Sequence, residues 1–126
     1  MENKPAEKTG MDRIWAAFFY SLNGLRFAIA KEAAFRQETC VIAIFLIALY
    51  YLPLSPVWKG LIFLTTALVL IVELLNSAIE SVVDLASPEY HDLAKQAKDL
   101  GSAAVLVSIV VAAVLWASAI IQIIRL

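Results

Sequence analysis

The feature that most constrains this chain is the length of its uncharged apolar runs. The residues from Leu100 to Ile124 include no Asp, Glu, Lys or Arg, and a second uncharged run extends from Thr39 to Trp58. A helix needs about 20 apolar residues to cross the ~30 Å hydrocarbon core of a bilayer. Hydrophobic residues make up 62% of the 126 residues, against about 45–50% in soluble domains. The sequence therefore predicts a single all-α membrane domain over residues 1–126.

Prolines and polar residues divide the chain into segments. Pro53 and Pro56 fall in the sequence LPLSP, which predicts a tight turn between two spans. Ser87-Pro88 ends the next helix, because proline disfavours helix in the residue before it. A polar connection is expected over 89–97. The predicted segments are a tail over 1–12, a surface helix over 13–31, and three membrane spans over 33–52, 58–86 and 98–124.

The segment 13–31 has the period of an amphipathic helix. Arg13, Tyr20 and Gly24 share one face, and a different face is apolar. The apolar positions are Ile14, Phe18, Leu22, Leu25 and Ile29. Such a helix lies in the membrane interface with its apolar face in the lipid. No cleavable signal peptide is expected, because no apolar run with a small-residue cleavage site follows the charged first residues.

The distribution of positive charge predicts the orientation in the membrane. Of the ten Lys and Arg residues, six lie between Lys4 and Arg36, and Lys95 and Lys98 lie near the second connection. Because cytoplasmic segments carry the excess of Lys and Arg, the N-terminus and the second connection are expected in the cytoplasm. The net charge of −1 gives no indication of nucleic-acid binding. A single cysteine, Cys40, excludes an intramolecular disulfide and a multi-cysteine metal site.

A stripe of polar side chains runs along the second span. Its members are spaced 3, 1, 3 and 4 residues apart and share one helix face: Glu73, Asn76, Ser77, Glu80 and Asp84. A carboxylate at the bilayer centre costs at least ~2.5 kcal/mol. The stripe must therefore face protein, water or a ligand.

The depth of these carboxylates suggests a chemical role. Counted from the outer side, Glu73 lies about 20 Å into the ~30 Å core and Glu80 about 11 Å further, near the inner boundary. Glu32, Lys98 and Asp99 begin the other spans and are expected at the level of Glu80. Glu73 is deeper, where the glycerol of a lipid meets its acyl chains. It is the candidate general base.

Carboxylates and a lysine at a membrane surface fit magnesium–nucleotide chemistry. Mg²⁺ usually takes one or two carboxylates plus phosphate oxygens, and phosphoryl transfer needs cations and a base. The sequence has no GxxxxGK[ST] and no HRD and DFG set, so neither common nucleotide motif is present. The simpler alternatives are that Asn76 and Ser77 only join helices, that Lys98 and Asp99 mark the interface, and that His91 is a solvated loop residue.

Four strings resemble the prokaryotic diacylglycerol kinase family: EAAFRQE at 32–38, VELLNSAIESVVD at 72–84, SPEYH at 87–91 and AKDLGSAAVL at 97–106. Their order and spacing match over about residues 13–122. The resemblance implies a homotrimer with three membrane helices and one surface helix per subunit, and active sites shared between neighbours. It also implies transfer of the γ-phosphoryl group of MgATP to the primary hydroxyl of diacylglycerol in the bacterial inner membrane. The first dozen residues and LPLSP have no counterpart in the pattern.

The resemblance also implies roles for individual positions. Glu73 is implied as the general base, Glu32 and Glu80 as ligands of the ATP-bound Mg²⁺, and Asn76 as a support of the catalytic helix. The implied ATP contacts are Arg13, Tyr20, Glu32, Glu80, Glu89, His91, Lys98 and Asp99. The implied lipid contacts are Arg13, Ser21, Leu22, Arg26, Ala34, Phe35, Arg36, Gln37, Lys59, Glu73 and Ser102, where Lys59 replaces an arginine of the family pattern.

Three rival functions remain open at this point. An undecaprenol kinase of the same family would use the same chemistry, but that branch typically lacks the AAFRQ that follows Glu32 here. A proton-conducting or transport subunit would use Glu73 as a relay, although the carboxylates cluster toward one membrane face. A structural membrane subunit would use the polar stripe only to pack helices.

Overall fold

The computed structural model describes residues 9–125, and these residues form four α-helices. They are α1 (Gly10–Lys31), α2 (Ala33–Tyr51), α3 (Pro56–Ala86) and α4 (Asp92–Ile124). The prediction of an all-α membrane protein with three spans and an N-terminal amphipathic helix is confirmed. Most of the predicted tail over 1–12 lies outside the described residues, and its last three residues belong to α1.

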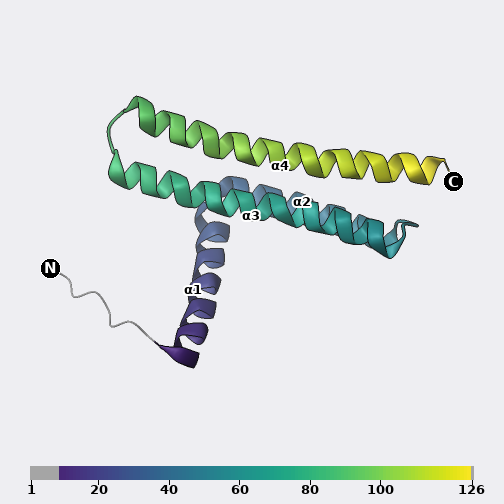
Figure 1. Cartoon of the computed structure of the whole chain (residues 1–126), viewed down its shortest axis with the longest axis horizontal. Coiled ribbons are helices and arrows are strands. Elements are labelled where there is room, and N and C mark those ends of the chain that lie inside the picture. The colour runs from purple at the N-terminus through teal and green to yellow at the C-terminus, as the bar shows by residue number, and fades with distance from the viewer. Residues whose placement is uncertain (1–8, 126) are drawn as a thin grey trace.

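The three apolar helices form an elongated bundle, and α1 projects from its side. Figure 1 shows α3 and α4 side by side and antiparallel, with α2 behind α3 and α1 projecting away at a steep angle. The packing between α3 and α4 is the most extensive in the molecule. At 1.5 Å per residue α3 and α4 are about 46 and 50 Å long, whereas α2 is about 28 Å long. Of the three apolar helices, only α2 matches the ~30 Å thickness of the hydrocarbon core, and α3 and α4 are longer than this core.

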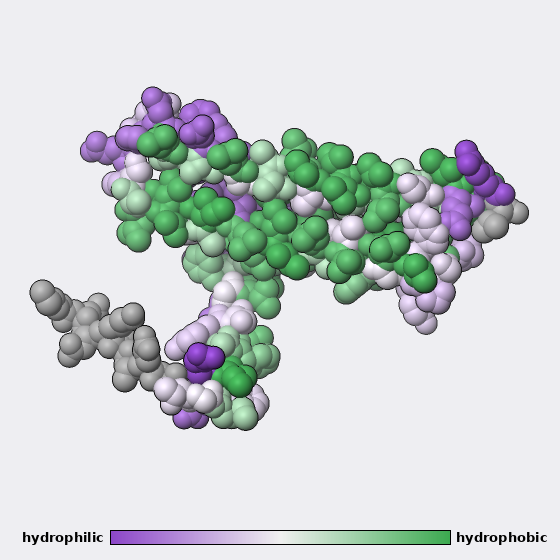
Figure 2. All heavy atoms as spheres, in the orientation of Figure 1, coloured by the Kyte–Doolittle hydropathy of each residue, from purple (hydrophilic) through white to green (hydrophobic). Residues whose placement is uncertain are grey.

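The surface of the bundle is that of a membrane protein. The helices α2, α3 and α4 are each long and apolar enough to cross a bilayer. Figure 2 shows a continuous hydrophobic surface along the bundle, with hydrophilic residues gathered at its two ends. Large apolar side chains on these helices, such as Ile44, Leu64 and Val107, are more than 60% exposed in the single chain. The chain is therefore a multi-pass membrane protein whose outer surface needs lipid or protein contacts.

The turn between α2 and α3 shows why α3 begins two residues earlier than predicted. Ser55 is the N-cap residue, and its Oγ accepts a hydrogen bond from the backbone N–H of Trp58 at 3.4 Å. Pro56 occupies the first turn, where its missing N–H removes no helical hydrogen bond and its φ angle suits a helix. The proline that the sequence suggested as a helix breaker therefore starts the helix.

The beginning of α4 corrects a second expectation. The polar connection was predicted over 89–97, but residues from Asp92 onward are helical. His91 is the N-cap residue, and its Nδ1 accepts a hydrogen bond from the backbone N–H of Leu93 at 3.1 Å. A capped first turn needs no hydrophobic residues. The helix therefore extends well past the apolar run that revealed it.

Small residues on α4 allow the bundle to pack closely. Ala119 packs against Ile62 of α3 and Leu49 of α2, and Ala112 packs against Val69 and Ile42 of the same two helices. Small side chains at such contacts let the helix backbones approach closely. Close packing matters here because lipid provides no hydrophobic driving force between membrane helices. This core holds α3 in the position from which Asn76 and Asp84 of the polar stripe face α4.

A hydrogen bond between helices supports this core and gives a testable prediction. The indole Nε1–H of Trp116 on α4 donates to Thr66 Oγ1 on α3 at 3.2 Å. Trp116→Phe should lower the free energy of unfolding by about 0.5–1.5 kcal/mol, measured by reversible unfolding from mixed micelles. Thr66→Val should cost a similar amount. The double variant should cost little more than either, and fully additive losses would mean that the two groups do not depend on each other.

Candidate functional site

The first two residues of the polar stripe of α3, Glu73 and Asn76, are buried inside the chain. Glu73 is only 6% exposed and Asn76 only 8%, although both lie on a helix whose other faces are largely exposed and apolar. Ser77 and Glu80 are half-buried one turn further along. A carboxylate in this position is held away from bulk water, as a general base within a membrane must be.

Carboxylates from three segments gather around Glu73. Glu32 at the junction of α1 and α2, and Glu80 on α3, are both near enough to repel the Glu73 carboxylate. Glu38 on α2 interacts with Glu73 in the same way. So many carboxylates around one position need cations to neutralise them. The cluster therefore suits a ligand that brings positive charge, such as a metal ion.

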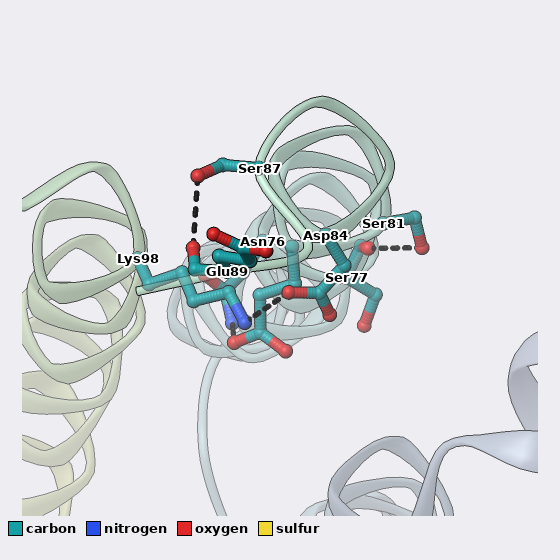
Figure 3. A network of polar contacts seen from close by, with 8 residues as sticks. Asn76, Ser77, Ser81, Asp84, Ser87, Glu89 and Lys98 are labelled. Carbon is teal, nitrogen blue, oxygen red and sulfur yellow. Dashed lines mark hydrogen bonds and ion pairs between the residues drawn. The ribbon is translucent and has the colours of Figure 1, made fainter. Parts of the chain in front are cut away.

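Asn76 fixes the orientation of Glu80. Its Nδ2 donates to Glu80 Oε1 at 3.0 Å, within α3 at a spacing of four residues. Figure 3 shows Asn76 within a network of polar side chains on α3 and the start of α4. The carboxylate of Glu80 is thus held back along α3, on the side of Asn76.

Lysine side chains from α4 complete the polar end. Lys98 Nζ forms an ion pair with Asp84 Oδ1 on α3 at 2.5 Å, and Figure 3 shows Lys98 pointing from α4 toward α3. Lys95 pairs with Asp99 at 2.5 Å within α4. The ammonium group of Lys98 reaches past the level of Glu80. Its partner Asp84 lies about 6 Å further along α3, because the lysine side chain extends toward the end of the bundle.

A cavity between α1 and α3 lies beside the carboxylates. It has a volume of about 510 Å³ and is lined by Ser21 and Gly24 of α1, by Glu32, and by Ser77 and Ser81 of α3, together with apolar side chains. Glu32 is the one residue between α1 and α2, where it has an extended backbone. The junction thus places a carboxylate in the wall of a cavity at the membrane surface.

A second cavity of about 540 Å³ is formed by α2, α3 and α4. Its walls are mostly apolar, and polar side chains lie at one end. Gln37 and Glu38 are among these lining residues, and Glu38 Oε2 is buried with no hydrogen-bond partner within residues 9–125. An apolar cavity with a polar end suits an amphipathic molecule such as a lipid.

The arrangement can bind a metal-bound nucleotide rather than a bare metal ion. Within residues 9–125, no three His, Cys, Asp or Glu side chains lie close enough to hold a metal by themselves. Mg²⁺ usually binds one or two protein carboxylates and completes its shell with waters and substrate phosphates. The residues present therefore fit a Mg²⁺ that arrives with ATP.

Comparison with known proteins shows which family the chain belongs to. Residues 19–120 match the family described as prokaryotic diacylglycerol kinase. The chain belongs to this family. The match covers most of the region in which the sequence strings resemble the family, so that resemblance is confirmed.

Curated members of the prokaryotic diacylglycerol kinase family are similar over most of their length. A diacylglycerol kinase of Escherichia coli (strain K12) is 47% identical over 108 residues, which cover 86% of this chain and 88% of that protein. A diacylglycerol kinase of Pseudomonas aeruginosa is 45% identical over 111 residues, covering 88% and 90% of the two chains. One from Helicobacter pylori (strain J99) is 42% identical over 113 residues, covering 89% and 88%.

The residues expected to contact ATP in this family lie in two separate regions of a single chain. Lys98 and Asp99 lie on α4, and His91 and Glu89 lie just before it. Ser87 Oγ donates to the carbonyl of Glu89 at 3.0 Å, which shapes this connection. The first turns of α1, which carry Arg13, project away from the bundle (Figure 1). One chain therefore does not bring the α1 residues together with those of α4.

The residues expected to contact lipid are also spread over several environments. Ser21 and Gln37 line the two cavities, and Phe35 is 4% exposed in the interior. The remaining positions on α1, α2 and α4 are exposed or half-buried: Leu22, Arg26, Ala34 and Ser102. Of the expected lipid contacts, Ser21 and Gln37 thus line a cavity that could take an acyl chain.

Two basic residues of the expected lipid set bind backbone carbonyls instead of a common site. Arg36 Nη1 donates to the carbonyls of Ile29 and Ala30 at 3.2 Å each, at the end of α1. Lys59 Nζ donates to the carbonyl of Tyr50 at 2.8 Å, at the end of α2. Lys59 is about 21 Å along α3 from Glu73. The structure does not bring it to the carboxylate cluster.

Sequence reasoning missed three residues that the structure brings to the site. Glu38 was named only as the last residue of EAAFRQE, and Asp84 only as part of the stripe. Yet Glu38 is near enough to repel the Glu73 carboxylate, and Asp84 pairs with Lys98. Gly101 lies buried against Asn76. The string KDLGSAAV contained this glycine, but its partner on α3 becomes apparent only when the two helices are packed.

Proposed function

We propose that this protein is an ATP-dependent diacylglycerol kinase, which transfers the γ-phosphoryl group of ATP to the primary hydroxyl of diacylglycerol and so forms phosphatidic acid. The single observation that carries the proposal is a buried carboxylate, Glu73, within a membrane-spanning helix and close to Glu32 and Glu80. Family membership and the names of the similar proteins support this reading.

Glu73 is proposed as the base that accepts the proton of the lipid hydroxyl. Its depth suits an alcohol that stays in the membrane, because the glycerol of a lipid lies where the headgroups meet the acyl chains. Because Glu73 is buried within the chain, water has poor access to it and competes less with the lipid for the phosphoryl group. The proton moves from the hydroxyl to the Glu73 carboxylate as the oxygen bonds to phosphorus. The leaving group is ADP.

Glu32 and Glu80 are proposed to hold the Mg²⁺ that accompanies ATP. Their carboxylates offer the hard oxygen ligands that this ion prefers, and Asn76 orients that of Glu80. When bound, Mg²⁺ would neutralise charge on the phosphates. Lys98 is proposed to exchange its contact with Asp84 for a phosphate oxygen. Arg13, Tyr20, Glu89, His91 and Asp99 are proposed as the other nucleotide contacts.

The lipid is proposed to bind beside the same carboxylates. Ser21 and Gln37 each line a cavity that has both polar and apolar walls, and either arrangement would accept a glycerol group with its acyl chains. The further lipid contacts are proposed to be Arg13, Leu22, Arg26, Ala34, Phe35, Arg36, Lys59, Glu73 and Ser102.

A homotrimer is proposed as the active form, with each site shared between neighbouring chains. The separation of Arg13 from the α4 residues within one chain supports this, because a neighbour's α1 would have to complete the nucleotide site. The membrane is proposed to be the bacterial inner membrane, with α1 and the α3–α4 connection in the cytoplasm, where ATP is available. The excess of Lys and Arg on these segments supports that orientation.

The decisive experiment compares lipid substrates. Purified protein in lipid-containing micelles, with MgATP, should phosphorylate diacylglycerol to phosphatidic acid and should phosphorylate undecaprenol far more slowly. Product is measured by transfer of labelled phosphate, and omission of Mg²⁺ is the negative control. A preference for undecaprenol would identify the sister activity of the same family. Proton flux across liposomes without ATP would instead support a relay, and complete inactivity would leave a structural role.

A further inference from the structure

We propose that Gly101 is a positioning residue of this kinase: it leaves the space on α4 that lets Asn76 aim the Glu80 carboxylate. The inference rests on the proposed function, because Glu80 is there the ligand of the nucleotide-bound metal. Gly101 itself contacts neither substrate.

The contact between Gly101 and Asn76 is so close that a side chain at position 101 would require the Asn76 amide to move. Gly101 is buried in the middle of α4, facing α3. A methyl group at this position would lie 3.3 Å from Asn76 Cγ and would overlap Asn76 Oδ1. A glycine in a helix interior is otherwise unfavourable, because glycine loses more conformational freedom on folding than alanine does. The close approach therefore gives a physical reason for glycine at this position.

The other three glycines show that this constraint is specific to position 101. A methyl group at Gly10, Gly24 or Gly60 would meet no atom within 4 Å. Gly60 lies in α3, which is, like α4, a membrane-spanning helix. It therefore provides a matched control for the same substitution.

The amide of Asn76 links this contact to the site. Its Nδ2 donates to Glu80 Oε1 at 3.0 Å, while Oδ1 is buried against α4 without a hydrogen-bond partner among the described residues. The Asn76 side chain is therefore held at Oδ1 by close packing against Gly101 and at Nδ2 by a hydrogen bond to Glu80. Any shift of the amide forced by a larger residue at position 101 would move the donor away from Glu80.

The test is a double-mutant cycle between Gly101→Ala and Asn76→Ala. Gly101→Ala should lower the thermal unfolding midpoint, whereas Gly60→Ala should not. Gly101→Ala should also raise the half-saturating Mg²⁺ concentration by about tenfold or more. Loss of a residue that supports a metal ligand typically has an effect in this range. Asn76→Ala should raise that concentration similarly, and Gly101→Ala should add little in the Asn76→Ala background, because the overlapping atom is then gone.

The outcomes separate this inference from the proposed function. If the wild type makes no phosphatidic acid, the function is wrong, and the unfolding cycle still decides whether the glycine acts through Asn76. The inference is overturned if Gly101→Ala behaves like Gly60→Ala in a kinase that is active, or if it is equally harmful with and without Asn76. If Gly101→Ala alone fails to fold, the double variant must fold; its failure would also overturn the inference.

Discussion

Replacement of Glu73 by glutamine should lower kcat for diacylglycerol phosphorylation by about 10²–10⁴-fold, the contribution expected of a general base. Glutamine keeps the size and hydrogen-bonding shape of the side chain but cannot accept the proton of the lipid hydroxyl. Because Glu73 is only 6% exposed, water has poor access to replace the missing base. The measurement is initial rate of phosphatidic acid formation at saturating MgATP and diacylglycerol.

The assembly of the Glu73→Gln protein should be nearly unchanged. Loss of one buried charge relieves repulsion from Glu80 and Glu32, so the proposed oligomer should form as in the wild type, which size-exclusion chromatography of both proteins checks. Asp12→Asn is a matched control, since it makes the same chemical change on an exposed residue at the start of α1. Near-normal turnover by Glu73→Gln would show that another group accepts the proton.

Glu80→Gln should instead change the use of magnesium. Removal of a residue that merely supports a metal ligand costs about 10–100-fold in metal affinity, and loss of the ligand itself should cost at least as much. The half-saturating Mg²⁺ concentration should therefore rise by this factor or more, with a smaller change in the half-saturating concentration of diacylglycerol. The measurement is a Mg²⁺ titration of initial rates at fixed total ATP.

Ser81→Ala provides the comparison for Glu80→Gln. Ser81 follows Glu80 on α3, and its hydroxyl donates only to the carbonyl of Ser77 at 2.9 Å, so its loss should leave the Mg²⁺ titration unchanged. If Glu80→Gln lowered kcat and left the Mg²⁺ requirement as in the wild type, Glu80 would not be a metal ligand. Its role would then lie closer to the reacting atoms.

The membrane architecture could be predicted from sequence because it depends on properties that are local. Uncharged runs of about 20 residues report a span directly, and the spacing from Glu73 to Asp84 places a polar stripe on one face of any helix. Caps were harder to foresee. His91 begins α4 and Pro56 begins α3, yet both residues are also common in loops.

The contacts between helices could not be predicted from one sequence. The hydrogen bond between Trp116 and Thr66 joins residues 50 positions apart. The contact of Gly101 with Asn76 depends on the relative position of α4 and α3 along their axes. Glu38 is a further example, because nothing in its own helix indicates that it lies near enough to Glu73 to repel it. These features follow from the register between helices, which many side chains determine together.

The junction between α1 and α2 has a consequence for how the protein adapts to its membrane. Only Glu32 separates the two helices, and Arg36 on α2 binds the last carbonyls of α1. With α1 lying in one leaflet, the carboxylates keep a fixed distance from the lipid headgroups on that side. Hydrophobic mismatch with a thicker or thinner bilayer must then be absorbed by tilt or deformation at the opposite end, around Tyr50 and Lys59. Diacylglycerol would meet its base at the same depth in membranes of different thickness.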